Sequence, residues 1–420
     1  MAIKAPSRKQ TVKNKKRQSV STDSCKIQEI LIKGVEDIIE KPSLLNKLKS
    51  GKKLRIKLGL DPTGPKIHLG RAEQLWKLKA FQDLGHQIVL VLGDFTAQIG
   101  DASDKTSMRK PLSLQEVKRN LKEYLPQIGK ILDLSKTDIR YNSQWLTKIK
   151  LQEMLRLASY FTSQQMIQRR NFKERWELGK PIGLHELYYP ILQGYDSVVI
   201  KSDVEIGGYD QLFNLQIGRE LQKIFGQSPQ DIMILKMLPN LEGEKMSTSK
   251  GNLITIVDSP REMYGKIMSL KDELIPLYFE LAANYPSAEV SKIIKQLNSH
   301  QINPKILKAQ LAKEIVALYY GRQEALKEAE WFEKTFTQKQ IPQDMVTVVL
   351  RDSQAPLLVI LKHCFSQGQK SVSEIKRLIN YGAVEIDGQV KKNPYEIINL
   401  PSTGLRIKIG KRNWFRVLPK

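Results

Sequence analysis

The sequence is poor in cysteine and has no long apolar run. Its 420 residues include only two cysteines, Cys25 and Cys364, too few for a disulfide framework or a cysteine-based zinc site. No apolar segment approaches the roughly 20 residues that a membrane-spanning helix needs, and the apolar core of a secretory signal is missing. We therefore expect a protein of the reducing cytoplasm with no membrane partner.

Acidic residues are also scarce relative to basic ones. The chain has 68 Lys and Arg against 44 Asp and Glu, which gives a net charge of +24. The excess gathers at the ends, because residues 1–22 hold seven basic residues and no acid, and residues 355–420 hold twelve basic and four acidic residues. This distribution favours a polyanionic partner, although a surface that is basic only for solubility stays an alternative.

The first 25 residues read as a disordered basic tail, since they are polar and lack apolar periodicity. Import into an organelle through this tail stays open, because the stretch is free of acids and contains serine and threonine.

The pattern from residue 54 onward is typical of an α/β fold. Residues 54–60 predict a strand, 69–84 a helix and 87–92 a second, almost continuously apolar strand. Such a unit predicts a buried parallel sheet, which binds ligands at the carboxyl ends of its strands. We further expect a helix at 26–50 and buried strands at 197–200 and 232–235.

Composition shifts divide the chain into a tail and four further regions. We expect a Rossmann-like nucleotide-binding domain at 26–244, a polar loop followed by an α-helical domain at 245–338, a linker at 339–354 and a small α+β domain at 355–420.

Residues 59–71 form a glycine-rich turn that leads from the first strand into a helix. Gly59 and Gly64 have the spacing of a phosphate-binding P-loop, but Pro65 stands where that loop needs a lysine. His68 and Arg71 begin the helix, whose amides and side chains favour a phosphate group. A lone histidine at a helix start is more often structural, and the flanking glycines shift the balance toward function.

Residues 240–252 make a short polar loop suited to clamping phosphate. The loop contains Lys245, Ser247 and Lys250, with further hydroxyls and a glycine. Considered alone, it would be read as an ordinary solvated loop. Together, however, the His-Leu-Gly and Lys-Met-Ser sequences resemble the HIGH and KMSKS signatures of class I aminoacyl-tRNA synthetases.

The region between these motifs resembles the tyrosyl-tRNA synthetases in particular, through residues 189–196 and 205–211. The resemblance implies a tyrosine site made of Asp101, Tyr189, Gln193, Asp196 and Gln211, in which Asp196 takes the phenol hydroxyl. It implies an ATP site that comprises Gly59, Asp61, His68, Gly70, Gly208, Asp210, Lys245 and Ser247. The catalytic residues that it implies are Thr63, His68, Arg71, Lys245 and Lys250.

Residue spacing agrees with this assignment at one point. Tyr189, Gln193 and Asp196 fall at i, i+4 and i+7, so a helix would place all three on one face. A solvated polar face is the alternative, but the apolar residues around them favour burial.

The C-terminal region resembles the S4 RNA-binding domain that bacterial members of this family carry, through residues 371–388. The resemblance implies a surface that follows the phosphates of tRNA(Tyr). Its basic residues are Lys376, Arg377, Lys391, Lys392, Lys408, Lys411 and Arg412.

Three residues depart from the common family pattern. Arg71 replaces the second histidine of HIGH, Thr248 replaces the second lysine of KMSKS, and Lys57 stands where one bacterial subgroup has a tyrosine that contacts the substrate phenol. The chain is nearer the second bacterial subtype. Arg71 keeps a cationic donor, and Lys245 and Lys250 would then carry the pyrophosphate contacts.

The resemblance implies a homodimeric tyrosine–tRNA ligase with an inserted interface near residues 130–180. It would join L-tyrosine to tRNA(Tyr) with ATP through an adenylate and no covalent enzyme intermediate, with Mg²⁺ carried by ATP and no dedicated protein metal site. Two alternatives stay open: an RNA-binding protein with a decayed catalytic body, and an adenylyltransferase for another acid.

Overall fold

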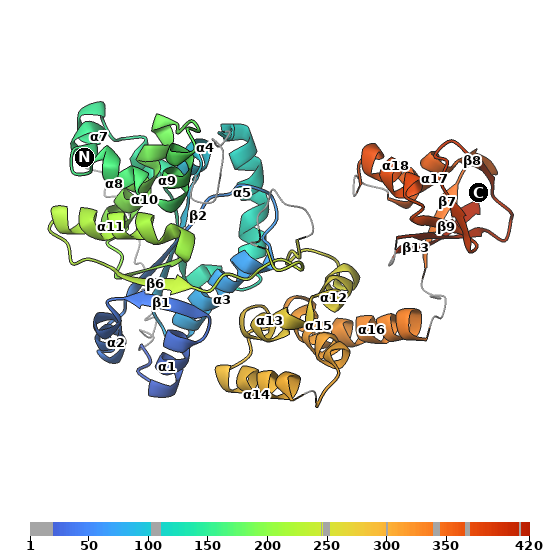
Figure 1. Cartoon of the computed structure of the whole chain (residues 1–420), viewed down its shortest axis with the longest axis horizontal. Helices are drawn as coiled ribbons and strands as arrows, with labels where there is room; N and C mark the ends of the chain where they lie inside the picture. Colours follow the sequence, from blue (N-terminus) through green and yellow to red (C-terminus); the bar gives the residue numbers. More distant parts are fainter. Residues whose placement is uncertain are drawn as a thin grey trace, which may run out of the picture. The chain divides into compact units, whose positions relative to one another are not determined.

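The computed structural model describes residues 20–101, 111–244, 246, 253–299, 301–338, 345–365, 370–410 and 413–420 (Figure 1). The chain divides into two compact units. The first comprises residues 1–257 and 270–304, and the second comprises residues 258–269 and 305–420. Most of the predicted tail lies outside the described residues, whereas helix α1 already begins at Ser24.

The first unit is built on a six-stranded sheet in the order β1-β6-β5-β2-β3-β4. All neighbouring strands run parallel except β1, which pairs antiparallel with β6. The predicted parallel α/β sheet is therefore confirmed, as are the strands expected at 54–60, 87–92 and 232–235. The strands are β1 (Val35–Ile39), β2 (Arg55–Leu60), β3 (Gln87–Leu92), β4 (Thr137–Tyr141), β5 (Val204–Gly208) and β6 (Asp231–Leu235).

Helices cover both faces of this sheet. α3 (Leu69–Asp83) connects β2 to β3, and α11 (Leu212–Ile224) connects β5 to β6 in the opposite direction across the sheet. Because such crossovers are right-handed, α3 lies on one face, and α11 lies on the other together with α10 (Leu184–Ile200). Two-sided burial explains why β3 and β6 are almost continuously apolar.

Two predictions about local structure are wrong. Residues 197–200 do not form a strand, because they are the last turn of α10. A four-residue apolar run fits a buried helix as well as a buried strand, so its pattern could not decide. The helix expected at 26–50 is divided into α1 (Ser24–Ile32), strand β1 and α2 (Lys41–Lys49), with Gly34 at φ +63° between α1 and β1.

Helices α10 and α11 approach closely because each has a glycine at the contact. A Cβ atom on Gly194 would lie 3.0 Å from the backbone nitrogen of Gly218. The remaining helices of the first unit are α4 (Thr96–Ile99), α5 (Leu114–Ile128), α6 (Ser143–Leu146), α7 (Leu151–Ala158), α8 (Ser163–Ile167), α9 (Arg170–Glu177), α13 (Ile275–Leu281) and α14 (Ser287–Asn298).

The second unit begins with helices, as the pattern up to residue 338 predicts. They are α12 (Pro260–Met268), α15 (Pro304–Tyr320) and α16 (Arg322–Phe332). Pro304 opens α15, where its missing N–H costs nothing. None of the helices in the described ranges is long and apolar enough to cross a membrane.

The C-terminal part of this unit contains a five-stranded sheet in the order β10-β9-β12-β13-β7 and two short helices. β7 lies inside the range expected as a linker, yet it pairs parallel with β13 and so belongs to the C-terminal fold. Asp387 and Gly388, at φ +42° and +87°, form the predicted turn between β9 and β10. The elements are β7 (Val346–Leu350), β8 (Gln354–Pro356), α17 (Leu357–Cys364), α18 (Val372–Asn380), β9 (Val384–Ile386), β10 (Gln389–Lys391), β11 (Ile397–Asn399), β12 (Leu405–Ile409) and β13 (Asn413–Pro419).

A buried ion pair holds α9 against the start of α10. The Arg175 guanidinium and the Glu186 carboxylate are 2.8 Å apart and almost wholly buried, and Glu186 also accepts the amide of Gly183 at 2.8 Å. Because α10 carries three of the predicted site residues, this pair fixes the helix that presents them.

We predict that Arg175→Met lowers the free energy of unfolding by about 3–5 kcal/mol, because it leaves a carboxylate buried without its cation. Urea unfolding measures the change. Lys223→Met is the matched control, since its pair with Glu220 is half exposed and is worth less than about 1 kcal/mol. Equal effects of the two substitutions would contradict this account.

Candidate active site

The site forms at the point in the sheet where the order of the strands reverses. β2 lies between β3 and β5, so the chain leaves β2 toward one edge of the sheet and later returns on its other side. Ligands of open α/β sheets bind at this kind of switch point. A cavity of about 370 Å³ opens there, lined by the carboxyl ends of β2 and β5 and by the turns that follow β3, β4 and β6.

Most of the predicted site residues line this one cavity, although they come from four separate stretches of chain. Lys245, Ser247 and Lys250 lie outside the described residues, while Met246 between them lines the cavity. The predicted residues that line it are Gly59, Asp61, Thr63, His68, Gly70, Arg71, Asp101, Tyr189, Gln193, Asp196, Gly208, Asp210 and Gln211.

Two glycines give the floor of the cavity its shape. A Cβ atom on Gly59 would meet nothing within 4 Å, so the end of β2 is open to a ligand. A Cβ atom on Gly93 would lie 1.9 Å from Oδ1 of Asp61, so any side chain there would displace the carboxylate.

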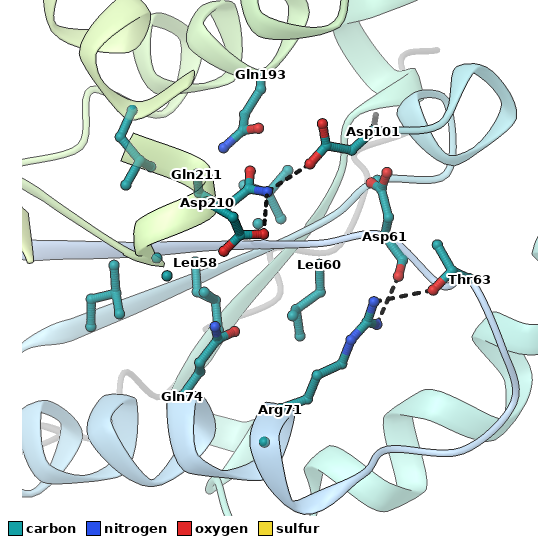
Figure 2. Close-up of a pocket in the computed structure, with 18 of the residues that line it drawn as sticks. Leu58, Leu60, Asp61, Thr63, Arg71, Gln74, Asp101, Gln193, Asp210 and Gln211 are labelled. Carbon is teal, nitrogen blue, oxygen red and sulfur yellow. Dashed lines mark hydrogen bonds between the residues drawn. The ribbon is translucent and has the colours of Figure 1, made fainter. Parts of the chain in front are cut away.

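Arg71 holds the turn that follows β2. Its Nη1 donates to the backbone oxygen of Asp61 at 2.9 Å, and its Nη2 donates to Oγ1 of Thr63 at 3.1 Å, as Figure 2 shows. Nη1 also donates to the hydroxyl of Tyr124 on α5. Arg71 therefore positions the glycine-rich turn from the side of α3, in addition to lining the cavity.

His68 stands at the N-terminus of α3 as a neutral imidazole. The residue is 7% exposed, and its Nδ1 has no hydrogen-bond partner among the described residues. Burial, with a smaller contribution from the Arg71 charge, lowers the pKa of His68 to about 3. The ring therefore enters the cavity with an unused nitrogen and without charge.

Backbone hydrogen bonds join the first motif to the segment that follows the second. The amide of Leu69 donates to the oxygen of Ile254 at 3.0 Å, and the amide of Ile256 donates to the oxygen of Ile67 at 3.0 Å. His68 and Thr255 form the bridge between them. The segment that follows the Lys-Met-Ser loop is thus fixed against the His-Leu-Gly turn.

Asp196 lies at the buried end of the cavity and is 3% exposed. Its Oδ1 accepts from Nε1 of Trp145 at 2.8 Å, and its Oδ2 accepts from Nδ2 of Asn142 at 3.3 Å. Burial raises the pKa of Asp196 to about 7, while the nearby Lys57 charge opposes the rise. Trp145 and Asn142 have no motif that sequence reasoning could have used.

Tyr189 connects this end to the turn after β2. Its hydroxyl donates to Oδ2 of Asp61 at 2.9 Å, and Thr96 donates to Oδ1 of the same carboxylate at 2.8 Å. Burial, followed by the Asp61 charge, raises the pKa of Tyr189 well above its ordinary value. Tyr189 is therefore a fixed hydroxyl donor.

Two more acidic residues, Asp101 and Asp210, line the cavity together with Gln211. Nε2 of Gln211 donates to Asp101 at 2.6 Å and to Asp210 at 3.3 Å, as drawn in Figure 2. Arg169, which the motifs did not indicate, pairs with Asp101 at 2.7 Å. Carboxylates and amide oxygens in this arrangement suit an ammonium group or sugar hydroxyls.

The cations predicted to contact RNA lie in the C-terminal part of the chain. Lys391 and Lys408 are paired with Glu396 and Glu385, and Lys376 donates to a tyrosine hydroxyl. Arg377 and Lys392 are exposed. Lys411 and Arg412 lie outside the described residues. In the described parts of both units, no group of three or more His, Cys, Asp or Glu residues could hold a metal ion.

The family model for "tRNA synthetases class I (W and Y)" matches residues 49–337. A tyrosine–tRNA ligase from Carboxydothermus hydrogenoformans is 44% identical over 401 residues, which cover 93% of this chain and 97% of that protein. The chain belongs to the tyrosyl-tRNA synthetase family. A tyrosine–tRNA ligase 2 from Clostridium acetobutylicum is also 44% identical, over 394 residues, with 93% and 97% coverage.

Solved structures of this family share the fold. The mitochondrial tyrosyl-tRNA synthetase of Aspergillus nidulans superposes with a TM-score of 0.62 at 21% identity, over 77% of this chain and 95% of that chain. The enzyme of Archaeoglobus fulgidus in complex with L-tyrosine gives a TM-score of 0.58 at 21% identity, over 72% and 98%. The chain is therefore an aminoacyl-tRNA synthetase of class I architecture.

The buried histidines His68 and His86 should make the free energy of unfolding depend on pH. Burial lowers the pKa of His68 to about 3 and that of His86 to about 4, whereas both would titrate near 6.5 in the unfolded chain. Below pH 6.5 the unfolded chain therefore binds more protons at these sites, and stability falls as pH falls.

We expect His68→Gln to remove one of these two contributions. Between pH 6 and 4 the variant should lose less unfolding free energy than the wild type, by up to about 1.4 kcal/mol for each pH unit. Urea unfolding at pH 7, 6, 5 and 4 measures the difference. Parallel curves for the two proteins would show that His68 is not held neutral.

Proposed function

We propose that this protein is a tyrosine–tRNA ligase that activates L-tyrosine with ATP and transfers it to tRNA(Tyr). The observation that carries the proposal is the buried carboxylate of Asp196 at the closed end of the cavity, fixed by Trp145 and Asn142. A phenol that reaches it would donate a hydrogen bond, whereas phenylalanine would leave the carboxylate without that donor. The family relatives support the same substrate.

The rest of the cavity accommodates the remainder of tyrosine. Asp101, Gln193 and Gln211 offer oxygens to the α-ammonium group on the wall opposite α3. Tyr189, which also lines the cavity, is held by Asp61. The carboxylate of tyrosine would then face the open end of β2, where Gly59 leaves room for the phosphates of ATP.

In the first step we propose that a carboxylate oxygen of tyrosine attacks the α-phosphate of ATP. The bond to the pyrophosphate oxygen breaks, and pyrophosphate leaves with its Mg²⁺, which enters as part of the nucleotide substrate. No nucleophile from the enzyme is needed, so catalysis consists of positioning and charge stabilisation.

The phosphate side of the cavity supplies the donors. We assign His68 and the α3 N-terminus to this side, together with the turn that Arg71 and Thr63 organise. We assign Lys245 and Lys250 to the pyrophosphate, and Gly70, Gly208, Asp210 and Ser247 to other parts of ATP. The hydrogen bonds between residues 67–69 and 254–256 support a loop that acts beside His68.

In the second step a hydroxyl of the terminal adenosine of tRNA attacks the adenylate carbonyl, and AMP leaves. We propose that the C-terminal domain, of the S4 type, binds tRNA through its basic residues. Among the described ones, Arg377 and Lys392 are exposed, while Lys391 and Lys408 would exchange their glutamate partners for phosphates. A bacterial-type cytoplasm is the setting we propose.

Two other functions remain to be separated from this one. An RNA-binding protein without catalysis would explain the basic ends and the departures at Arg71 and Thr248, but it would have no need of a complete phenol site. An adenylyltransferase for another acid would use the phosphate residues without needing Asp196.

We predict tyrosine-dependent exchange of pyrophosphate into ATP, with no exchange for phenylalanine or tryptophan. His68→Ala should lower the exchange rate by about tenfold or more while changing tyrosine affinity little, because His68 acts on the phosphate side. Exchange kinetics and equilibrium dialysis with tyrosine measure the two effects. Absence of exchange with every amino acid would favour the RNA-binding function, and equal losses in both measurements would refute the role of His68.

Apolar side chains exposed on α7, α9 and the start of α10 support a homodimer interface within or next to residues 130–180. Leu151 is 76% exposed, Trp176 64% and Leu184 76%. Large apolar side chains exposed on neighbouring helices are typical of protein interfaces.

We expect a dimer by light scattering and predict that Leu151→Asp with Leu184→Asp yields monomers. Leu326→Asp on α16 is the matched control, because Leu326 is 62% exposed outside the proposed interface. A monomeric wild type, or a double variant that stays dimeric, would contradict the interface.

A further inference from the structure

A buried charge pair lies directly beside the proposed phenol site. Lys57 on β2 and Glu205 on β5 face each other across the parallel strand pairing, with Nζ and Oε1 2.9 Å apart. Their side chains are 0% and 1% exposed. Neither residue lines the cavity, so the pair has no direct access to a substrate.

The pair is hydrogen-bonded to the turn of α10 that carries Asp196. Nζ of Lys57 donates to Oγ of Ser197 at 2.7 Å and to the backbone oxygen of Gln193 at 3.2 Å. Ser197 in turn donates to Oε2 of Glu205 at 2.8 Å, and Nε2 of Gln230 donates to the same oxygen. Asp196 therefore lies between two residues of α10 that are both bonded to the pair.

Asp196 has hydrogen-bond donors but no counter-ion. Trp145 and Asn142 are neutral, and Asp196 forms no ion pair within the described ranges. An isolated buried carboxylate is strongly disfavoured as an anion. Lys57 is the cation that favours its ionised form, and Glu205 opposes that effect.

We propose that Lys57 and Glu205 are positioning residues for tyrosine selection, which hold Asp196 in place and set the fraction of it that is ionised. The inference rests on the proposed function, because it concerns the same phenol site. Ionised Asp196 accepts the phenol hydrogen in a charge-assisted hydrogen bond, whereas protonated Asp196 carries a hydroxyl donor and accepts only through a neutral carbonyl oxygen, in a weaker bond.

The groups that face Asp196 define its pH response. They are Lys57 from β2, Glu205 from β5, Tyr189 from its own helix and the neutral donors Asn142 and Trp145. The pKa of Tyr189 is raised well above 10, so it does not titrate near neutrality. Because the pKa of Asp196 is about 7, tyrosine affinity should fall as pH decreases through neutrality.

Charge-removing variants of the pair should move this dependence in opposite directions. Lys57→Met removes the favourable cation, so the midpoint should rise and tyrosine affinity at pH 7 should fall. Glu205→Gln removes the opposing anion, so the midpoint should move to lower pH. A midpoint that moves by one pH unit changes tyrosine affinity about tenfold at pH values below the midpoint.

The experiment measures tyrosine affinity by equilibrium dialysis from pH 5.5 to 8.5, together with the KM for ATP. Lys47→Met is the matched control, because Lys47 pairs with buried Asp231 on β6, away from the cavity. We expect opposite midpoint shifts for the two variants of the pair, no shift for the control and little change in the KM for ATP. At pH 7, Lys57→Met should also select tyrosine over phenylalanine less strongly.

Carboxyl NMR of Asp196 in the ligand-free wild type and variants separates this inference from the proposed function. An Asp196 titration that moves up in Lys57→Met and down in Glu205→Gln would support the charge effect even if no amino acid were activated. Shifts in the same direction, or titrations that match the wild type, would overturn it. A merely structural role of the pair would lower stability in both variants without opposite shifts.

Discussion

The position of β2 between β3 and β5 is the constraint on which the site depends. Because all three strands are parallel, their carboxyl ends meet at one edge, and the loops that leave them diverge to either side. Asp61, Gly93 and Gly208 meet there although they are separated by up to about 150 residues of sequence. Strand pairing places the crevice, and the turns that follow the strands line it.

A second constraint joins the two phosphate motifs. The strand-like pairing of residues 67–69 with 254–256 fixes the end of the Lys-Met-Ser loop next to the N-terminus of α3. The segment that follows the loop therefore keeps a fixed register with His68. Arg71 contributes from the same helix by holding the Asp61–Thr63 turn, which accounts for a cation at this position even where a histidine is usual.

Local signals in the sequence predicted the parallel sheet and the two motifs, whereas the resemblance to the synthetase family supplied the other residues expected in the cavity, and all of these that are described line it. Periodicity revealed β2, α3 and β3, and glycine with charged residues marked the turns. It failed where tertiary packing decides the secondary structure. Residues 197–200 would be apolar as a strand or as a helix, and they are helical where α10 packs against α11. Trp145, Asn142 and Arg169 were missed since nothing in their neighbourhood in sequence shows that they face Asp196 or Asp101.

Lys57 shows how a departure from a family pattern can be explained only in the folded structure. A lysine in the middle of a buried strand is unstable unless a carboxylate faces it, and the β2–β5 register places Glu205 opposite. Lys57 and Glu205 therefore depend on each other for burial. Both charges also act on Asp196. The carboxylate that stabilises the buried lysine therefore also affects the residue proposed to bind the substrate phenol. In this site, stability of the sheet and discrimination among amino acids act through the same charges.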